Sequence, residues 1–305
     1  MNWTDYESHL EIYPPEDFNF EECLIFLSRS DREILHKIKS GSIYKLLKVK
    51  ESLILFKIEH TENTLKVEFP ISTPSIHLRE KVAEYIWEWF DLERDLTGFY
   101  QMALHDKVLK KLVHSYNGLR IICMPDLFEA LVWAVIGQQI NLTFAYTLKK
   151  RFVEQYGESL CFEGETFWIF PSIEKIALIS IDDLRKHQFT SRKAEYIIGI
   201  AKTMLNGELT KEVLLQKQDY EQVKKTLMMI KGVGAWTADY VMMKCLHNTS
   251  SLPIADVGLH NAIKNLLGLD MKPTVEEIKE YAVIWEGWEA YATFYLWRSL
   301  YDKKI

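Results

Sequence analysis

The chain contains 305 residues, of which 48% are hydrophobic and 26% charged, which is typical of a globular protein of about two domains. Its 37 basic and 43 acidic side chains give a net charge of −6, so any basic surface for a polyanion has to be local. Glu129 interrupts even the apolar helix at 127–136, and no segment approaches the roughly 18 uninterrupted apolar residues of a membrane span.

Alternating apolar and polar residues in the N-terminal region predict three strands. They lie at 43–49, 53–59 and 64–70, and the turn-like segments KES and HTEN separate them. Such short connections favour an antiparallel meander. Together with one helix, these strands are expected to form a small domain over residues 1–115.

From about residue 78 the hydrophobic pattern becomes helical almost throughout. The clearest helical segments are 78–90, 126–136, 191–205 and 274–285. Capping-box spacing predicts helix starts at Thr274 with Glu277, and at Asp219 with Gln222. We therefore predict an α+β fold that is mostly α, with the N-terminal sheet domain attached to a helical domain at 116–305.

Two glycines interrupt the helical pattern between residues 219 and 246. Gly232 and Gly234 can adopt backbone angles that other residues avoid, and they lack a Cβ, so consecutive amides can approach one anion. The helix that begins near Ala235 adds its N-terminal partial positive charge. The segment is predicted to be a helix, tight turn and helix that grips a phosphate, although such glycines can also merely reverse the chain.

A single carboxylate, Asp256, follows this hairpin by about one helix. It lies after Pro253 and before a helical pattern through Leu259 and Ile263, which is typical of a helix N-cap. The same carboxylate would suit cleavage of an N-glycosidic bond, because that reaction leaves oxocarbenium-like charge on the sugar. The two roles are compatible.

The segments KGVGAWTADY at 231–240 and LPIADVGLHNAI at 252–263 resemble the helix-hairpin-helix (HhH-GPD) DNA glycosylase superfamily. Further matches at 90–100, 118–140 and 285–300 occur in the family's order, so the resemblance covers most of the chain from residue 90 onward. Within the superfamily the chain is most similar to bacterial 3-methyladenine DNA glycosylase II, the AlkA type. The resemblance implies a two-lobed helical body.

The resemblance also implies an activity in base excision repair. The enzyme would flip an alkylated purine, such as 3-methyladenine or 7-methylguanine, out of double-stranded DNA and hydrolyse its bond to deoxyribose, with Asp256 as the catalytic residue. Members that also cut the strand resemble a variant with a lysine two residues beyond the second hairpin glycine. That position is Trp236 here, so we predict no AP-lyase activity.

Three aromatic residues are candidates for the base pocket. Trp236 and Tyr240 are four residues apart and share a helix face, and Trp297 matches a position where the family presents a base-stacking tryptophan. Their electron-rich faces would attract a purine that alkylation has made positively charged. Packing in the hydrophobic core is the alternative role for each of them.

The resemblance also gives the candidate DNA contacts. The backbone at Gly232, Val233, Gly234 and Ala235, together with Lys231, would grip phosphate. Gln139 matches the family's intercalating position, with Ile140 as its neighbouring alternative; otherwise the two residues only end the preceding helix. Residues 185–247 carry 11 basic and 6 acidic side chains, and the candidate basic contacts there are Arg192, Lys193, Lys224, Lys225, Lys231 and Lys244.

No cofactor is expected to be required for catalysis. In the family, hairpin carbonyls hold a monovalent cation that bridges to DNA phosphate, and these would be the carbonyls of Met228, Ile230 and Gly232. The four cysteines are scattered without CxxC spacing, so we predict neither an iron-sulfur cluster nor a structural metal. They fit a reducing compartment, and the start MNWTDYESHL has no secretory pattern, so a cytoplasmic, bacterial protein is expected. By analogy with the family, it would be a monomer.

Two other functions fit part of the sequence. An 8-oxoguanine-type glycosylase would share the fold and Asp256 but normally uses the lysine that is missing here. A non-catalytic protein that binds DNA structures would explain the glycines, yet it gives no task to Asp256 or the aromatic residues. Substitution of Asp256 separates these classes, because a protein that only binds DNA does not need the carboxylate for its function.

Overall fold

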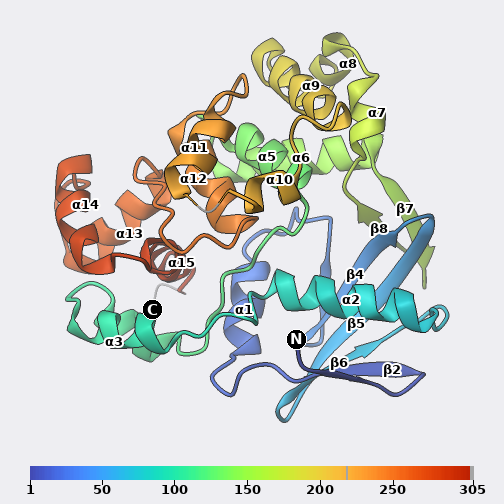
Figure 1. Ribbon diagram of the computed structural model, residues 1–305, viewed down its shortest axis with the longest axis horizontal. Helices are drawn as coiled ribbons and strands as arrows, with labels where there is room; N and C mark the ends of the chain where they lie inside the picture. The colour runs from blue at the N-terminus through green and yellow to red at the C-terminus, as the bar shows by residue number, and fades with distance from the viewer. Residues whose placement is uncertain (218, 303–305) are drawn as a thin grey trace.

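The structure is a computed structural model that describes residues 1–217 and 219–302 (Figure 1). Its N-terminal part is an antiparallel six-stranded sheet with the strand order β1-β2-β6-β5-β4-β3. The strands are β1 (Trp3–Asp5), β2 (His9–Ile12), β3 (Lys37–Lys39), β4 (Ser42–Val49), β5 (Ser52–Thr61) and β6 (Thr64–Glu68). The predicted meander is confirmed as β4, β5 and β6. Strands β1, β2 and β3 contain only three or four residues each, too few for alternation to reveal them.

Alternation along β5 sets the two faces of the sheet. Ile54, Phe56 and Ile58 belong to the main core, where α1 (Phe20–Leu27) and α2 (Ile76–Trp89) also bury apolar residues. On the opposite face, Leu55 packs with Phe167 of a hairpin made by β7 (Glu158–Phe162) and β8 (Glu165–Ile169). This hairpin comes from the helical part of the chain and covers part of the second face of the sheet, over β4 (Figure 1).

The rest of the described chain is helical, and the predicted helices are confirmed with small differences at their ends. The elements are α3 (Thr97–His105), α4 (Lys110–Ser115), α5 (Leu127–Gly137), α6 (Leu142–Tyr156), α7 (Ile173–Ala177), α8 (Ile181–Arg185), α9 (Ser191–Leu205), α10 (Lys211–Leu215), α11 (Tyr220–Met228), α12 (Ala235–Lys244), α13 (Val257–Leu267), α14 (Val275–Ala282), the 3-10 helix η1 (Val283–Trp285) and α15 (Glu289–Ser299). In Figure 1, α13, α14 and α15 lie on one side of α11 and α12, and α7, α8 and α9 lie on the other.

The two predicted capping boxes had different outcomes. Thr274 and Glu277 form theirs at the start of α14, with the Thr274 side chain bound to the Glu277 amide and the Glu277 carboxylate bound back to Thr274. The prediction of a capping box at the start of α11 was wrong. Asp219 does cap that helix, but it accepts from the amide of Glu221 instead.

One hydrophobic core runs through the sheet and the helical body. Helix α5 lies inside it, and every residue from 130 to 136 is buried. The domain boundary predicted at 115/116 stays a prediction, because residues on both sides of it pack in the same hydrophobic core. Among the described helices, none combines the length and the apolar character that crossing a membrane requires.

Candidate active site

Asp256 lies where three helices meet. It is the N-cap of α13, and its Oδ1 accepts the Leu259 amide hydrogen at 2.9 Å. The same oxygen accepts from the Trp297 indole Nε1 of α15 at 2.8 Å, and Oδ2 accepts from the Trp236 Nε1 of α12 at 3.1 Å. Three N–H donors from three helices thus fix the orientation of one half-buried carboxylate. The capping role predicted for Asp256 is confirmed, and it coexists with an arrangement suited to catalysis.

The three predicted aromatic residues form a continuous row beside Asp256. The ring centroids of Trp236 and Tyr240 are 5.5 Å apart, and those of Tyr240 and Trp297 are 5.9 Å apart. Trp133 of α5 holds the middle ring in place, because its Nε1 donates to the Tyr240 hydroxyl at 2.9 Å. Burial raises the pKa of Tyr240 well above its ordinary value, so its hydroxyl stays protonated. We call Trp236, Tyr240 and Trp297 the aromatic row.

Gly258 is a residue of this site that the sequence analysis missed. A Cβ at this position would lie 2.9 Å from Asp256 Oδ1 and 3.2 Å from the Trp297 ring. Only glycine therefore lets Trp297 approach the carboxylate closely. The sequence offered one signal for it, since glycine is unfavourable in the first turn of a helix that is otherwise well formed.

The hairpin turn between α11 and α12 has the predicted backbone. Gly232 has a φ of 93°, in the left-handed region, and a Cβ there would overlap the Tyr196 side chain at 2.2 Å. Gly234 is the N-cap of α12. The first amides of a helix have no partner within it, and Gly234 has no side chain to cap them. Gly234 and Ala235 are exposed, whereas the Val233 side chain is buried. The start of α12 is accessible to an anion.

Hydrogen bonds hold this turn on the protein. The Val233 amide donates to the Ile230 carbonyl at 3.0 Å, which closes the turn. Gln138, just after α5, donates through Nε2 to the Gly232 carbonyl at 2.9 Å and to Thr237 Oγ1 at 3.0 Å. Two of the three carbonyls predicted to bind a monovalent cation, those of Ile230 and Gly232, thus already accept one bond each. Met228, the third predicted residue, is the last residue of α11, and its side chain is exposed.

The six basic residues predicted to contact DNA divide into two groups. Arg192, Lys225 and Lys231 are exposed, and Lys231 forms an ion pair with Glu195 at 2.5 Å. The prediction was wrong for Lys193 and Lys244, which are buried and donate to the carbonyls of Ile136 and Ile122. Burial lowers the pKa of Lys244 to about 7. A count of basic residues along the sequence includes buried and exposed side chains alike. It therefore could not show that these two lysines lie on the inner faces of their helices.

Lys224 was also assigned wrongly. It donates to Asp239 Oδ2 at 2.9 Å, and the Tyr220 hydroxyl donates to Asp239 Oδ1 at 2.6 Å. Asp239 is buried on α12, while Lys224 and Tyr220 lie on α11. The three side chains connect the two hairpin helices, so Lys224 stabilises the hairpin and is engaged inside the protein.

The predicted wedge residues lie between α5 and α6. Gln139 is exposed and has a φ of 56°, which is uncommon for a residue other than glycine. Ile140 is half-buried and packs against the core. Backbone strain of this kind persists where the surroundings enforce it, and it often accompanies function. Of the two, Gln139 is the residue presented to solvent.

Arg29 is a second residue that the sequence analysis missed. It follows α1 of the N-terminal part, and its guanidinium carbon lies 4.1 Å from the Phe26 ring centroid and 5.6 Å from that of Tyr146. Tyr146 packs on Trp133 at 4.9 Å, and Trp133 binds Tyr240. A positive charge thus lies against Tyr146, the ring that packs on Trp133. The sequence carried no signal for it, because its position depends on how α1 packs against the helical body.

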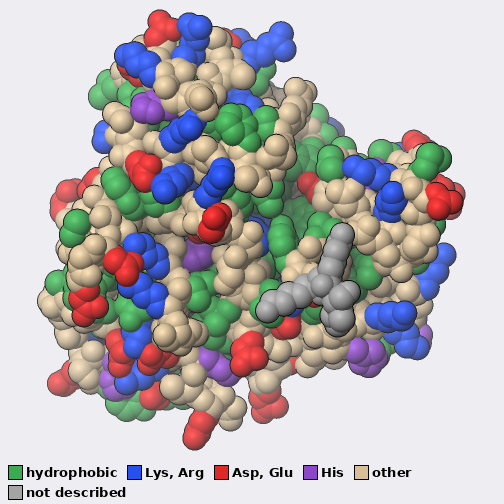
Figure 2. Space-filling view, turned by 180° about the vertical axis from the view of Figure 1, so that it is seen from behind, with side chains coloured by type: hydrophobic (Ala, Val, Ile, Leu, Met, Phe, Trp, Pro, Cys, Tyr) green, Lys and Arg blue, Asp and Glu red, His purple; other side chains and the backbone are tan. Residues whose placement is uncertain are grey.

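The surface around these elements carries mixed charge. On the face shown in Figure 2, lysine and arginine side chains alternate with acidic ones, and a hollow with hydrophobic side chains lies between two protruding parts. The predicted local excess of basic residues is therefore weaker on the surface than in the sequence, because three of the six candidate residues are engaged inside the protein.

Comparison with known proteins agrees with this geometry. Residues 132–287 match the HhH-GPD superfamily of base excision DNA repair proteins, and residues 12–131 match the N-terminal domain of 8-oxoguanine DNA glycosylase. A DNA-3-methyladenine glycosylase from Bacillus subtilis (strain 168) is 44% identical over 304 residues, which cover 99% of this chain and 100% of that relative.

Solved structures share the fold over nearly the whole length. A 3-methyladenine DNA-glycosylase from Archaeoglobus fulgidus has a TM-score of 0.82 and 24% identity, and covers 96% of this chain and 97% of its own. An 8-oxoguanine glycosylase/lyase from Clostridium acetobutylicum, in complex with dsDNA containing cytosine opposite to 8-oxoG, has a TM-score of 0.78 and 19% identity, with 100% and 99% covered.

These matches show that the chain belongs to the HhH-GPD superfamily of base excision DNA repair proteins, as its hairpin motif predicted. The described fold, a six-stranded sheet with a helical body, is shared with these two solved structures over nearly their whole length. The protein is a DNA glycosylase, and its partner is DNA.

Proposed function

We propose that this glycosylase is monofunctional and hydrolyses the bond between an alkylated purine and deoxyribose, leaving an abasic site. The observation that carries the proposal is the attachment of both aromatic-row tryptophans to Asp256 through their indole N–H groups. This arrangement places electron-rich ring faces next to a carboxylate. A cationic purine and the cationic sugar that it leaves are the partners such a site favours.

The chemistry needs few groups. An alkylated purine already carries positive charge, so it departs as a neutral base without a general acid. Asp256 then stabilises the oxocarbenium-like sugar and orients the attacking water, which supplies the new C–O bond and loses its proton. Two donors occupy Oδ1 and one occupies Oδ2, so Oδ2 keeps the free acceptor position for that water.

The absence of lyase activity is proposed from the residue at the nucleophile position. Trp236 stands two residues beyond Gly234, and its indole nitrogen is a donor only. The two nearest lysines in sequence have other tasks, since Lys231 pairs with Glu195 and Lys244 donates to a buried carbonyl. Neither side chain is among the donors bound to Asp256.

DNA would be held at two positions. The exposed amides at the start of α12, with Lys231 beside them, would bind a backbone phosphate through the helix N-terminus. Gln139 would fill the space that the flipped nucleotide leaves, since its strained backbone presents it to solvent. A monovalent cation at the hairpin carbonyls stays part of the proposal, with the Met228 and Ile230 carbonyls as its ligands beside that of Gly232.

The test uses methylated duplex DNA with the wild-type protein and the variant Asp256→Asn. Released bases are followed by chromatography, and strand breaks are counted before and after alkali. We expect methylpurine release by the wild type only, with breaks appearing only after alkali. Breaks before alkali, or a covalent adduct trapped by borohydride, would show a lyase and refute the monofunctional assignment.

A second candidate substrate has one observation in its favour. The match of residues 12–131 to the N-terminal domain of 8-oxoguanine DNA glycosylase makes 8-oxoguanine the competing lesion. A duplex with 8-oxoguanine opposite cytosine belongs in the same assay. Release of 8-oxoguanine in place of methylpurines would replace the alkylpurine assignment.

A further inference from the structure

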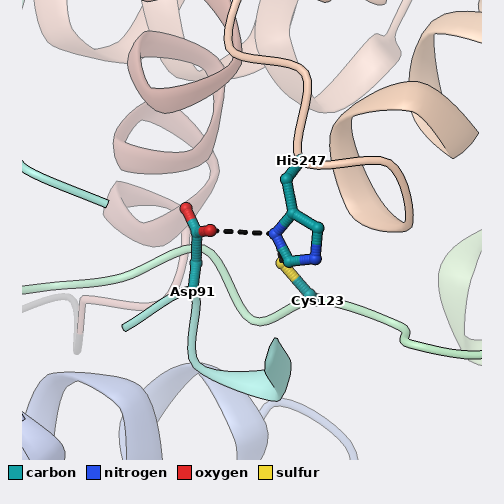
Figure 3. Close-up of side chains that lie close together, drawn as sticks. All are labelled: Asp91, Cys123 and His247. Atoms are coloured by element: carbon teal, nitrogen blue, oxygen red, sulfur yellow. Dashed lines mark hydrogen bonds and ion pairs between the residues drawn. The ribbon is translucent and has the colours of Figure 1, made fainter. Parts of the chain in front are cut away.

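A cluster of metal-ligating side chains lies away from the contacts of Asp256. Asp91 follows the C-terminus of α2, Cys123 lies in the extended segment before α5, and His247 follows α12. Their ligand atoms all lie within 4.8 Å of one another (Figure 3). Nδ1 of His247 is 2.8 Å from Asp91 Oδ1 and 3.6 Å from Cys123 Sγ, so oxygen and sulfur converge on the same ring nitrogen.

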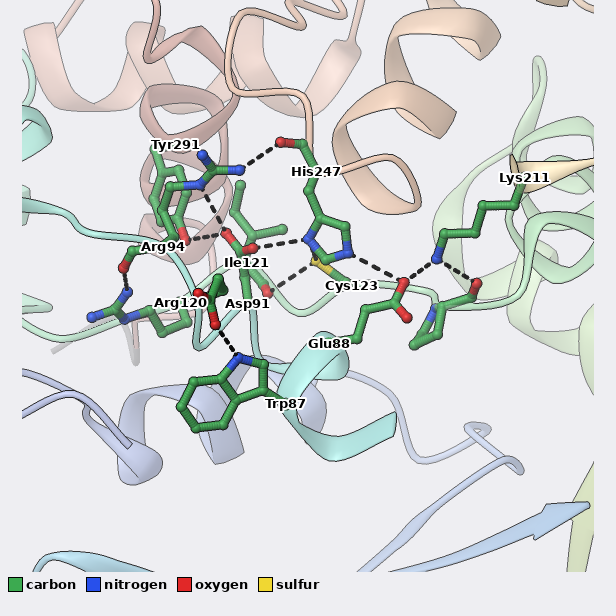
Figure 4. A network of polar contacts seen from close by, with 12 residues as sticks. Trp87, Glu88, Asp91, Arg94, Arg120, Ile121, Cys123, Lys211, His247 and Tyr291 are labelled. Carbon is green, nitrogen blue, oxygen red and sulfur yellow. Dashed lines mark hydrogen bonds and ion pairs between the residues drawn. The ribbon is translucent and has the colours of Figure 1, made fainter. Parts of the chain in front are cut away.

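Neighbouring side chains orient His247 and Asp91 (Figure 4). His247 Nε2, the nitrogen that faces away from the cluster, lies 3.2 Å from Glu88 Oε1. The second oxygen of Asp91 accepts from the Tyr291 hydroxyl at 2.6 Å. A carboxylate on the far nitrogen of a histidine and a donor on the far oxygen of a carboxylate are the arrangement that surrounds metal sites in proteins.

The backbone at two of the three positions is strained. Asp91 has a φ of 48° and His247 has a φ of 53°, both in the left-handed region. Arg94 holds the His247 loop by donating to its carbonyl at 2.9 Å. Such strain persists where surrounding structure enforces it, and it is concentrated at functional sites. It turns both side chains inward, toward Cys123.

We propose that Asp91 Oδ1, Cys123 Sγ and His247 Nδ1 bind one Zn²⁺ ion, with water as the fourth ligand of a tetrahedral site. A thiolate with an imidazole selects zinc over magnesium or calcium, which prefer oxygen ligands alone. Binding replaces water molecules of the hydrated ion with bonds to Oδ1, Sγ and Nδ1 and keeps one water as the fourth ligand. The thiol proton leaves to solvent, and the Nδ1 proton leaves as well when His247 starts as imidazolium. When His247 starts as imidazolium, two protons leave as one divalent ion enters, so the charge of the buried cluster is unchanged.

The ion would act on stability, because its ligands come from three parts of the chain. Asp91 belongs to the end of the helix that covers the sheet, whereas Cys123 and His247 border two helices of the glycosylase body. One ion would therefore tie α2 to the segments that flank α5 and α12. Sequence spacing pointed to no structural metal, since 32 and 124 residues separate these ligands along the chain.

The experiment measures metal content and does not depend on glycosylase activity. The protein is freed of metal by a chelator, equilibrated with excess zinc, dialysed, and analysed for zinc per chain. We expect one zinc per wild-type chain and a loss of most of it in Cys123→Ser and His247→Ala. Cys245→Ser is the matched control, because Cys245 is also buried and its Sγ donates to the Pro125 carbonyl, and it should keep one zinc.

Two further measurements on the wild type cover the case in which a variant fails to fold. Cobalt in place of zinc should give the charge-transfer absorption of a cobalt–thiolate bond. Zinc at about a hundredfold excess over its Kd should raise the Tm by about 5 °C, and a chelator should reverse this. Substoichiometric zinc, cobalt spectra without the thiolate band, or zinc binding that survives Cys123→Ser would overturn the proposal and leave only a hydrogen-bonded ion-pair network.

Discussion

The substitution Trp297→Phe tests how Asp256 is held. It keeps an aromatic face next to Tyr240 but removes the indole N–H that donates to Asp256 Oδ1 at 2.8 Å. A hydrogen bond to a charged group contributes about 1.5–3 kcal/mol net, and Trp297 is 9% exposed, so solvent replaces the lost donor poorly. If that energy is lost from the orientation of Asp256 that the transition state requires, the rate of base release should fall about 10- to 150-fold.

The assay is single-turnover release of methylpurines from methylated duplex DNA, with affinity for the same DNA measured separately. Trp87→Phe is the matched control, because the half-buried Trp87 of α2 also donates through Nε1 to a carboxylate oxygen, Glu93 Oε2, at 2.8 Å, but that carboxylate is exposed. The control should retain the wild-type rate. Trp236→Phe should lower the rate less than Trp297→Phe, since its bond to Oδ2 is longer at 3.1 Å.

Two results would refute this reasoning. If Trp297→Phe released bases within about twofold of the wild-type rate, the indole donor would not position Asp256. If the variant instead lost only DNA affinity at an unchanged rate, Trp297 would serve base stacking alone. Either outcome would separate the stacking role that the sequence predicts for Trp297 from the positioning role that the structure adds.

Three other predictions follow from the same geometry. Gly258→Ala should lower glycosylase activity at least about tenfold, because its Cβ would displace Asp256 or Trp297. The control is Gly199→Ala in α9, where the added Cβ meets open space; it should keep full activity and gain up to about 1 kcal/mol of stability. Gly232→Ala should destabilise the protein by more than about 1 kcal/mol, from a φ of 93° and an overlap with Tyr196, and thermal unfolding should show a clearly smaller loss for Gly234→Ala, whose added Cβ meets open space. Lys244 has its pKa lowered to about 7 by burial, so above pH 7 the unfolded chain, with a lysine pKa near 10.4, binds more protons than the folded one, and stability should rise with pH. Denaturant unfolding at pH 7 and pH 9 should show this rise, at most about 1.4 kcal/mol per pH unit, and Lys244→Met should remove it; an equal rise in the variant would assign it to other groups.

The sequence by itself determined the longer regular elements of the N-terminal sheet, several helices and the class of the protein. The alternation at 43–70 predicted β4, β5 and β6, and the helical periodicity predicted α5 and α9 to within one residue; the helix predicted at 274–285 is α14 followed by the 3-10 helix η1. Both patterns are local, because each residue's side-chain direction depends only on its own strand or helix. The hairpin glycines and the position of Asp256 were equally local signals, and they led to the superfamily.

Only the tertiary structure decided which side chains share a site. The bonds from Trp236 and Trp297 to Asp256 join α12, α13 and α15, and the burial of Lys193 and Lys244 depends on which helix face packs inward. Arg29 packs on Tyr146, and Asp91, Cys123 and His247 meet, only because distant segments pack together. Such contacts depend on the three-dimensional path of the whole chain, and no local pattern of residues encodes that path.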